Sequence, residues 1–276
     1  MAGDFSNPTP MRGRVLICAG SDSGGGAGIQ ADIKAVTALG GFASTALTAL
    51  TAQNTEGVHG IHEVPLEFID QQIRVVVEDI GADCVKTGML HNESVIRTVI
   101  AALDACAKDT PVVVDPVMVA KGGHRLLDPE ALDALREEMV PRARLVTPNI
   151  PEAELLSGLE IKDLDDMHRA AERLLALGPR AVLLKGGHME GDVLTDLLVT
   201  PDGAESFSGP RLDTPHTHGT GCTMASAIAT CLAQGLDVST AVRRARGYVH
   251  AAIVTAPGLG RGHGPLNHAH TVRADA

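Results

Sequence analysis

The sequence predicts an α/β protein with a mostly parallel sheet that is covered by helices on both faces. Short β-branched runs alternate with longer segments that are rich in Ala and Leu. The runs are apolar almost throughout, which is typical of strands that are buried on both faces of a sheet. We expect strands at 14–19, 43–50, 84–87, 112–115, 145–147 and 181–185, and helices at 28–39, 66–79, 92–107, 129–139, 151–157, 165–177, 219–234 and 238–254.

Length and composition fit one folded domain. The chain has 276 residues, of which 44% are hydrophobic and 21% are charged, and aromatic residues are scarce. No internal repeat, low-complexity run or linker divides the sequence. We therefore expect a single domain over residues 14–266, with flexible termini at 1–13 and 267–276.

Charge and cysteine content exclude several classes of protein. The formal net charge is −11, which argues against a partner that is a nucleic acid. An acidic protein that binds a polyanion must concentrate positive potential locally. Five scattered cysteines without a CxxC pair indicate reduced thiols and a cytoplasmic location. No apolar run reaches about 18 residues, so we expect no membrane span.

Polar and glycine residues gather directly after the expected strands. Examples are Ser21-Asp22 after the first strand, Asp115-Pro116 after the fourth and Lys185-Gly186 after the sixth. In open parallel sheets, ligands bind beyond the carboxyl ends of the strands. This edge of the sheet is therefore the expected ligand site.

The loop from Gly20 to Gly28 follows a strand and precedes a helix. It contains five glycines in nine residues, which lets backbone N–H groups approach a ligand closely. It is not a P-loop, because no Lys follows, and Ile29 stands where a GxGxxG motif needs its last glycine. A tight strand-to-helix turn is the alternative, but the number of glycines favours contact with a ligand.

A second glycine turn, His218-Gly-Thr-Gly-Cys222, opens a helix of small residues. Backbone donors and the helix dipole at such a start form a pocket for anions. A thiol in the position of Cys222 tends to have a lowered pKa. The alternative is a plain helix start with a buried cysteine, and the residues alone do not separate the two interpretations.

Asn149 and Glu152 lie one turn apart where another strand ends and a helix begins. An amide and a carboxylate at this spacing can hold a hydrated Mg²⁺. The same residues also form an ordinary N-cap with a capping box, and the pattern alone favours that interpretation. Asp115 offers a second acid at the same edge, and Lys185 can neutralise phosphate charge.

Eight stretches, in order from about residue 14 to residue 266, resemble one known family. They are Ala19-Gly-Ser-Asp, Gly25-Gly-Ala-Gly-Ile-Gln-Ala-Asp-Ile-Lys34, Thr48-Ala-Leu-Thr-Ala-Gln-Asn-Thr55, Val85-Lys-Thr-Gly-Met89, Val114-Asp-Pro-Val-Met118, Thr147-Pro-Asn-Ile-Pro-Glu-Ala153, Leu184-Lys-Gly-Gly-His188 and Thr217-His-Gly-Thr-Gly-Cys-Thr223. The family is that of the hydroxymethylpyrimidine/phosphomethylpyrimidine kinases of thiamine biosynthesis, in the ribokinase-like superfamily.

The resemblance implies a three-layer α/β/α kinase that uses ATP and Mg²⁺. Its substrate would be 4-amino-5-hydroxymethyl-2-methylpyrimidine, which it phosphorylates twice, and it would form a homodimer. Carried over by position, the substrate residues are Gln53, Gly20, Asp32 and Met89; the anion hole is Gly219, Thr220 and Gly221; the Mg²⁺ residues are Asp115, Asn149 and Glu152; and Lys185 lies near the ATP phosphates. Cys222 stands where most ribokinase-like enzymes carry an Asp as general base.

Three other functions compete with this one, and the third, a nucleotide-dependent dehydrogenase, is disfavoured by the missing GxGxxG motif. A pyridoxal kinase performs the same chemistry on a pyridine alcohol with the same scaffold, and Gln53 and Met89 favour the pyrimidine. A non-catalytic sensor is disfavoured because the glycines of the turn and the acids are all present. The sequence leaves open whether Cys222 accepts the proton of the alcohol or only shapes the pocket.

Overall fold

An eight-stranded sheet forms the centre of the protein, which a computed structural model describes over residues 11–120, 123–189 and 191–272. The strands are β1 (Arg14–Ala19), β2 (Phe42–Leu47), β5 (Cys84–Thr87), β6 (Val112–Val114), β7 (Leu145–Val146), β8 (Val182–Leu184), β9 (Val193–Thr200) and β10 (Gly203–Pro210). Their order is β10-β9-β8-β7-β6-β5-β1-β2. The strands from β8 to β2 run parallel, whereas β9 and β10 are antiparallel to their neighbours.

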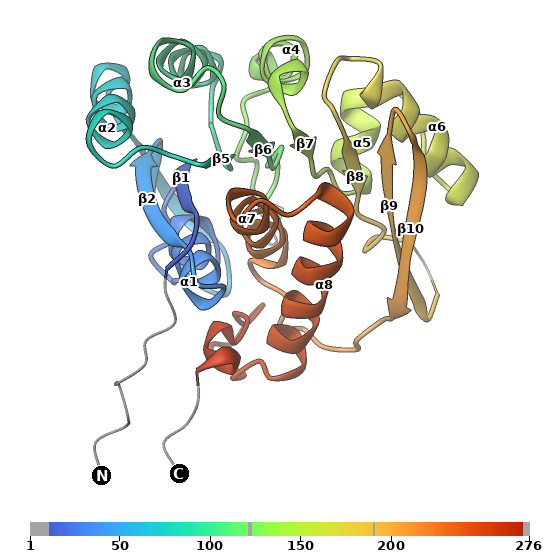
Figure 1. The fold of residues 1–276 in the computed structure, drawn as a ribbon. Coiled ribbons are helices and arrows are strands. Elements are labelled where there is room, and N and C mark those ends of the chain that lie inside the picture. The colour runs from blue at the N-terminus through green and yellow to red at the C-terminus, as the bar shows by residue number, and fades with distance from the viewer. Residues whose placement is uncertain (1–10, 121–122, 190, 273–276) are drawn as a thin grey trace.

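Helices cover both faces of this sheet, which confirms the expected three-layer architecture (Figure 1). One layer contains α2 (Leu66–Asp79), α3 (Glu93–Cys106), α4 (Leu132–Ala134), α5 (Ile150–Ser157) and α6 (Leu164–Leu175). The other contains α1 (Gly28–Ala38), α7 (Thr220–Ala233) and α8 (Val238–Val254). The helix expected at 129–139 is instead a succession of short helical turns: η1 (Pro129–Ala131), α4, η2 (Leu135–Met139) and η3 (Val140–Arg142).

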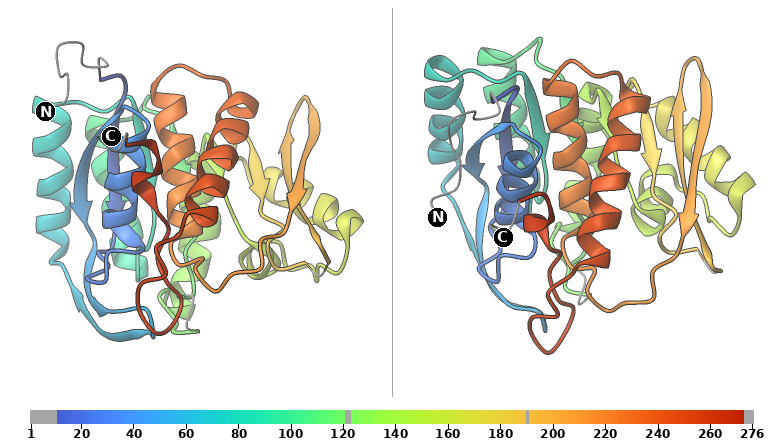
Figure 2. Two further views of the ribbon diagram at one scale, coloured as in Figure 1. Left: turned by 90° about the horizontal axis from the view of Figure 1, so that it is seen from below. Right: turned by 60° about the horizontal axis from the view of Figure 1, so that its bottom comes forward.

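A separate hairpin of β3 (Ala49–Gln53) and β4 (Val58–Glu63) follows β2. We expected one continuous strand over 43–50, but the chain leaves the main sheet at Thr48. The buried Thr48 hydroxyl donates to the Met89 carbonyl oxygen at 2.7 Å, which holds this bend at the carboxyl end of the sheet. The hairpin thereby reaches beyond the sheet edge, beside the segment that follows α8 (Figure 2).

The β9–β10 hairpin was missing from the sequence-based prediction. Strand β10 lies at the sheet edge, and most of its residues are exposed. Its sequence is therefore polar and glycine-containing rather than apolar, which removes the pattern by which buried strands are found.

The segment after α8 corrects the expected flexible end. Residues His268–Thr271 form the short helix η4, and the His268 side chain is buried. Its ring packs against Tyr248, and its Nε2 lies 3.0 Å from the Thr223 hydroxyl of α7. These contacts order the segment up to residue 272. The other expected flexible ends, residues 1–10 and 273–276, lie outside the described residues.

At the start of the described chain, the Arg12 amide donates to the Gly40 carbonyl oxygen. Within the described ranges, no helix has the length and apolar character needed to cross a membrane.

Candidate active site

A lysine and an aspartate meet at the carboxyl edge of the sheet. Lys185 follows β8 and Asp115 follows β6, and Lys185 Nζ lies 3.2 Å from Asp115 Oδ1. The Thr147 hydroxyl donates to the same carboxylate oxygen at 3.2 Å. Burial lowers the pKa of Lys185, but the carboxylates of Asp115 and Glu152 outweigh this and raise it, so the ammonium group stays charged.

Asn149 and Glu152 form the capping box of α5. The Asn149 side-chain oxygen accepts from the Glu152 amide at 3.0 Å, and the Glu152 carboxylate accepts from the Asn149 amide at 2.8 Å. The N-cap interpretation is thus correct, but it does not explain why Glu152 is 7% exposed. Burial and the nearby Asp115 raise the pKa of Glu152 to about 7, while Lys185 opposes this shift.

The donor set at this edge fits Mg²⁺ better than a transition metal. Asp115 and Glu152 provide two carboxylates, and no cluster of three or more His, Cys, Asp or Glu within the described ranges could hold a metal. Mg²⁺ keeps several water ligands and is bound through one or two carboxylates together with substrate phosphates. Two buried carboxylates that repel one another also gain when a cation lies beside them.

The second glycine turn faces the same group of charges. Helix α7 begins at Thr220, and a Cβ atom added to Gly221 would lie 3.4 Å from Lys185 Nζ and 3.8 Å from Asp115 Oδ2. The N-terminus of α7 and the Lys185 ammonium therefore converge on one point. Although the chain has a net charge of −11, this point thus brings together two groups that attract anions.

Gly219 joins this turn to the first glycine loop. Its φ is 84°, and a Cβ atom there would lie 1.8 Å from the Gly26 carbonyl oxygen. Gly28 has a φ of 54° and packs in the same way against the Gly20 carbonyl oxygen. These glycines are thus required by contacts between two backbones. The loop and the turn, far apart in the sequence, form one wall of the site.

Cys222 differs electrostatically from the expectation. Burial raises the pKa of its thiol to about 12; Lys86 acts in the opposite direction, and Asp32 and Asp115 raise the pKa further. The expected lowering of this pKa was therefore wrong. The helix N-terminus and one ammonium group are too weak to offset desolvation and two carboxylates.

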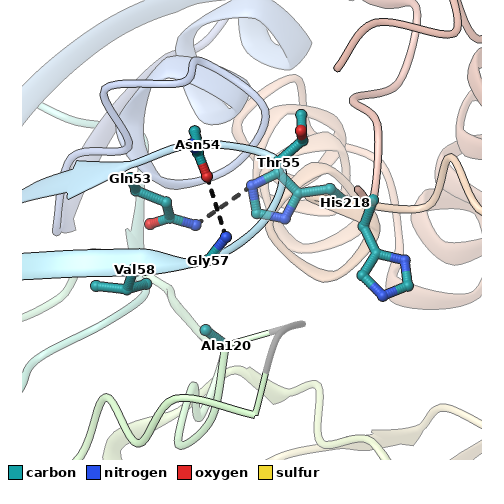
Figure 3. Close-up of a pocket in the computed structure, with 8 residues that line it drawn as sticks. Gln53, Asn54, Thr55, Gly57, Val58, Ala120 and His218 are labelled. Carbon is teal, nitrogen blue, oxygen red and sulfur yellow. Dashed lines mark hydrogen bonds between the residues drawn. The ribbon is translucent and has the colours of Figure 1, made fainter. Parts of the chain in front are cut away.

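Three of the expected substrate residues lie on or beside the β3–β4 hairpin. A Cβ atom on Gly20 would lie 3.1 Å from the Met89 sulfur, and Met89 packs with Ala49 and Leu126. Gln53 ends β3 and points toward His218, across a small hollow (Figure 3). The hollow is lined by Gln53, Asn54, Thr55, Gly57, Val58, Ala120, His218 and His263.

Asp32 lies beneath the site and has no exposed surface. Its carboxylate accepts from Lys86 Nζ at 3.0 Å and from the Ser226 hydroxyl at 2.7 Å. The facing carboxylate raises the pKa of Lys86 despite burial, which keeps the ammonium group charged, whereas burial raises the pKa of Asp32. This cluster connects α1, β5 and α7 below Cys222. The structure does not bring Asp32 to the hollow beside Gln53, so any effect on a substrate there is indirect.

Sequence reasoning did not assign a role to Asp22 or Lys86. Asp22 holds the glycine loop by accepting from the amides of Gly24, Gly26 and Ala27 at 2.8, 3.0 and 2.8 Å. Burial raises the pKa of Asp22, but hydrogen bonds from His218 and these amides outweigh it and hold the pKa below its usual range. A lone acid in a glycine loop was the available signal for Asp22, and a lysine inside a buried strand was the signal for Lys86.

The fold and this edge define the class of protein as a small-molecule kinase with the ribokinase-like architecture. The family model described as phosphomethylpyrimidine kinase matches residues 22–267, and the chain belongs to this family.

Curated relatives agree with the family assignment. The chain is 50% identical to a hydroxymethylpyrimidine/phosphomethylpyrimidine kinase of Streptomyces coelicolor, over 92% of this chain and 93% of the relative. It is 55% identical to the thiamine biosynthesis bifunctional protein ThiED of Geobacter sulfurreducens, over 96% of this chain. The match spans only 54% of that longer protein.

Solved structures show the same fold in two kinds of kinase. A phosphomethylpyrimidine kinase of Clostridium difficile has 41% identity and a TM-score of 0.78, over 87% of this chain and 99% of that one. An ADP complex of a Bacillus subtilis pyridoxal kinase has 37% identity and a TM-score of 0.87, over 94% and 98% of the two chains.

Proposed function

We propose that the protein transfers the γ-phosphoryl group of ATP to 4-amino-5-hydroxymethyl-2-methylpyrimidine and then phosphorylates the monophosphate to the diphosphate. The observation that carries this proposal is the convergence of the α7 N-terminus with Lys185 and two buried carboxylates at one sheet edge. The family and the curated relatives supply the substrate class.

In the proposed reaction, the chain mainly positions the reactants and stabilises charge. The Gly219–Gly221 amides face the transferred phosphoryl group, and Lys185 neutralises charge on the ATP phosphates. Asp115 and Glu152, oriented by the capping box with Asn149, would hold Mg²⁺, which neutralises phosphate charge when bound. Gln53, Gly20 and Met89 would form the pyrimidine pocket.

The two phosphorylations differ in their need for a base. The first starts from an alcohol that must lose a proton, whereas the second starts from an ionised phosphate oxygen. A thiol with a pKa of about 12 keeps its proton at neutral pH. We therefore favour a role for Cys222 in lining the site over a role as general base.

The decisive assay incubates the purified protein with ATP, Mg²⁺ and the pyrimidine alcohol, and separates the products by anion-exchange chromatography. We expect a monophosphate that is later converted to a diphosphate. Lys185→Met should reduce both rates at least about a hundredfold, because it removes a positive charge aimed at the phosphates. Exposed Lys162→Met is the matched control and should leave both rates unchanged. A wild-type protein without either activity would refute the proposal.

A pyridoxal kinase is the second candidate. It is favoured by the TM-score of 0.87 to pyridoxal kinases of known structure. The same assay with pyridoxal separates the two, since only the pyrimidine enzyme forms a diphosphate. A higher kcat/KM for pyridoxal, with no diphosphate formed from the pyrimidine, would favour this second function. For either function we expect a cytoplasmic homodimer.

A further inference from the structure

His218 lies where the glycine loop, the anion-binding turn and the β3–β4 hairpin meet. Its side chain is buried, and its Nε2 is 2.9 Å from Asp22 Oδ2. The same nitrogen is 3.4 Å from the Nε2 atom of Gln53 (Figure 3). Asp22 is 2% exposed, so the contact between Asp22 and His218 is almost closed to water.

The partner of His218 determines where its proton lies. An ionised carboxylate only accepts hydrogen bonds, and the pKa of Asp22 is held below its usual range. The Nε2 atom of His218 must therefore carry a hydrogen and donate it toward Asp22. A ring nitrogen that carries a hydrogen has no lone pair to accept from an amide NH₂ group.

Only one orientation of the Gln53 carboxamide avoids placing a donor against the Nε2 hydrogen of His218. With the NH₂ group toward His218, two donors face one another at 3.4 Å. A half-turn of the amide exchanges its oxygen and nitrogen at little cost in shape. The oxygen then faces the His218 Nε2 hydrogen, which is shared between Asp22 at 2.9 Å and, more weakly, Gln53 at 3.4 Å, and the NH₂ group faces the Thr51 hydroxyl.

Thr51 favours the same orientation. Its hydroxyl lies 2.8 Å from the Ser21 carbonyl oxygen, which only accepts, and 3.2 Å from the near end of the Gln53 amide. Since a hydroxyl has one hydrogen, which goes to Ser21, its lone pairs are free to accept from the Gln53 NH₂ group. In this orientation no two donors of the chain of contacts face one another.

We propose that His218, held in place by Asp22, is a positioning residue that fixes the carboxamide orientation of Gln53. The carboxamide orientation in turn determines the orientation in which the pyrimidine ring binds. An aminopyrimidine presents an amino donor beside a ring-nitrogen acceptor, so a carboxamide pairs with both only in one sense. A reversed amide turns the ring and moves its hydroxymethyl group away from the anion-binding turn. This inference rests on the proposed function.

A double-mutant cycle between His218 and Gln53 tests the inference. His218→Leu removes the donor but keeps an apolar side chain against Gly26, whereas His218→Gln supplies an amide NH₂ group with two hydrogens for the acceptors Asp22 and Gln53. We expect His218→Leu to raise the KM for the pyrimidine alcohol roughly tenfold, the effect of about one hydrogen bond. The KM for ATP should stay within about twofold, and His218→Gln should recover most of the loss.

The cycle is completed with Gln53→Ala. If His218 acts through Gln53, His218→Leu should add no further increase in KM for the alcohol once Gln53 is replaced by alanine. Additive effects, an equal loss in the KM for ATP, or no rescue by His218→Gln would overturn the inference while leaving the proposed kinase intact. If the wild-type protein does not phosphorylate the pyrimidine alcohol, the proposed function and this inference both fail.

Discussion

Replacing Glu152 by Gln should stabilise the ligand-free protein at neutral and alkaline pH. Glu152 is 7% exposed, and burial together with Asp115 raises its pKa from the usual 4.5 to about 7. The folded state therefore holds this proton more strongly than the unfolded state. The resulting stability is fully present below the unfolded pKa and is lost as the pH rises through about 7.

The magnitude follows from the shift. At about 1.4 kcal/mol per pH unit, a rise from 4.5 to about 7 corresponds to ~3 kcal/mol. The amide introduced by Glu152→Gln does not ionise, yet its oxygen can still accept from the Asn149 amide and keep the cap. The difference in unfolding free energy between Glu152→Gln and wild type should grow by about 2.5 kcal/mol between about pH 5 and about pH 8, because Glu152 already ionises in the unfolded chain at pH 5. For a chain of this size this is roughly 5–10 °C in Tm.

Thermal unfolding followed by circular dichroism measures this effect, since the chain has no Trp and one Tyr and its intrinsic fluorescence is weak. Glu160→Gln, at an exposed position beside Lys162, is the matched control and should follow the wild type at each pH. A difference between Glu152→Gln and wild type that stays constant across this range would refute the electrostatic reasoning. The same variant should lose kinase activity, because it removes one of the two carboxylates proposed to hold Mg²⁺.

Three further predictions concern the glycine turn and the buried ion pair. Cys222→Ala should slow both phosphorylations by a similar factor, because the thiol keeps its proton; a selective loss of the alcohol step in steady-state assays would restore the base role. Gly219→Ala should abolish activity and lower Tm, since its Cβ atom would lie 1.8 Å from the Gly26 carbonyl oxygen; a fully active variant would contradict this packing. Lys86→Met should lower the unfolding free energy in urea by about 3–5 kcal/mol, because it leaves Asp32 buried and unpaired, and adding Asp32→Asn should recover part of the loss. A single variant as stable as the wild type would show that Asp32 is not charged.

Buried parallel strands and their connecting helices could be predicted from the sequence, because burial on both faces of the sheet requires an apolar run of residues. The predicted bounds of β1, α2, β5 and α8 agree with the structure. Elements at the edge of the sheet could not be predicted in this way. The exposed strand β10 has no such run, and the bend at Thr48 depends on a hydrogen bond to a residue of a different segment.

The sequence by itself determined the kinase scaffold, the two glycine segments and the charged residues at the strand ends, because backbone conformation and strand burial leave local patterns. Only the tertiary structure decided how they act together. Asp22 and His218 are separated by 196 residues, and Asp32 and Ser226 by 194. The high pKa of Cys222 and the raised pKa of Glu152 depend on desolvation and on charges from other segments. Those quantities follow from three-dimensional neighbours, which no local pattern of residues records.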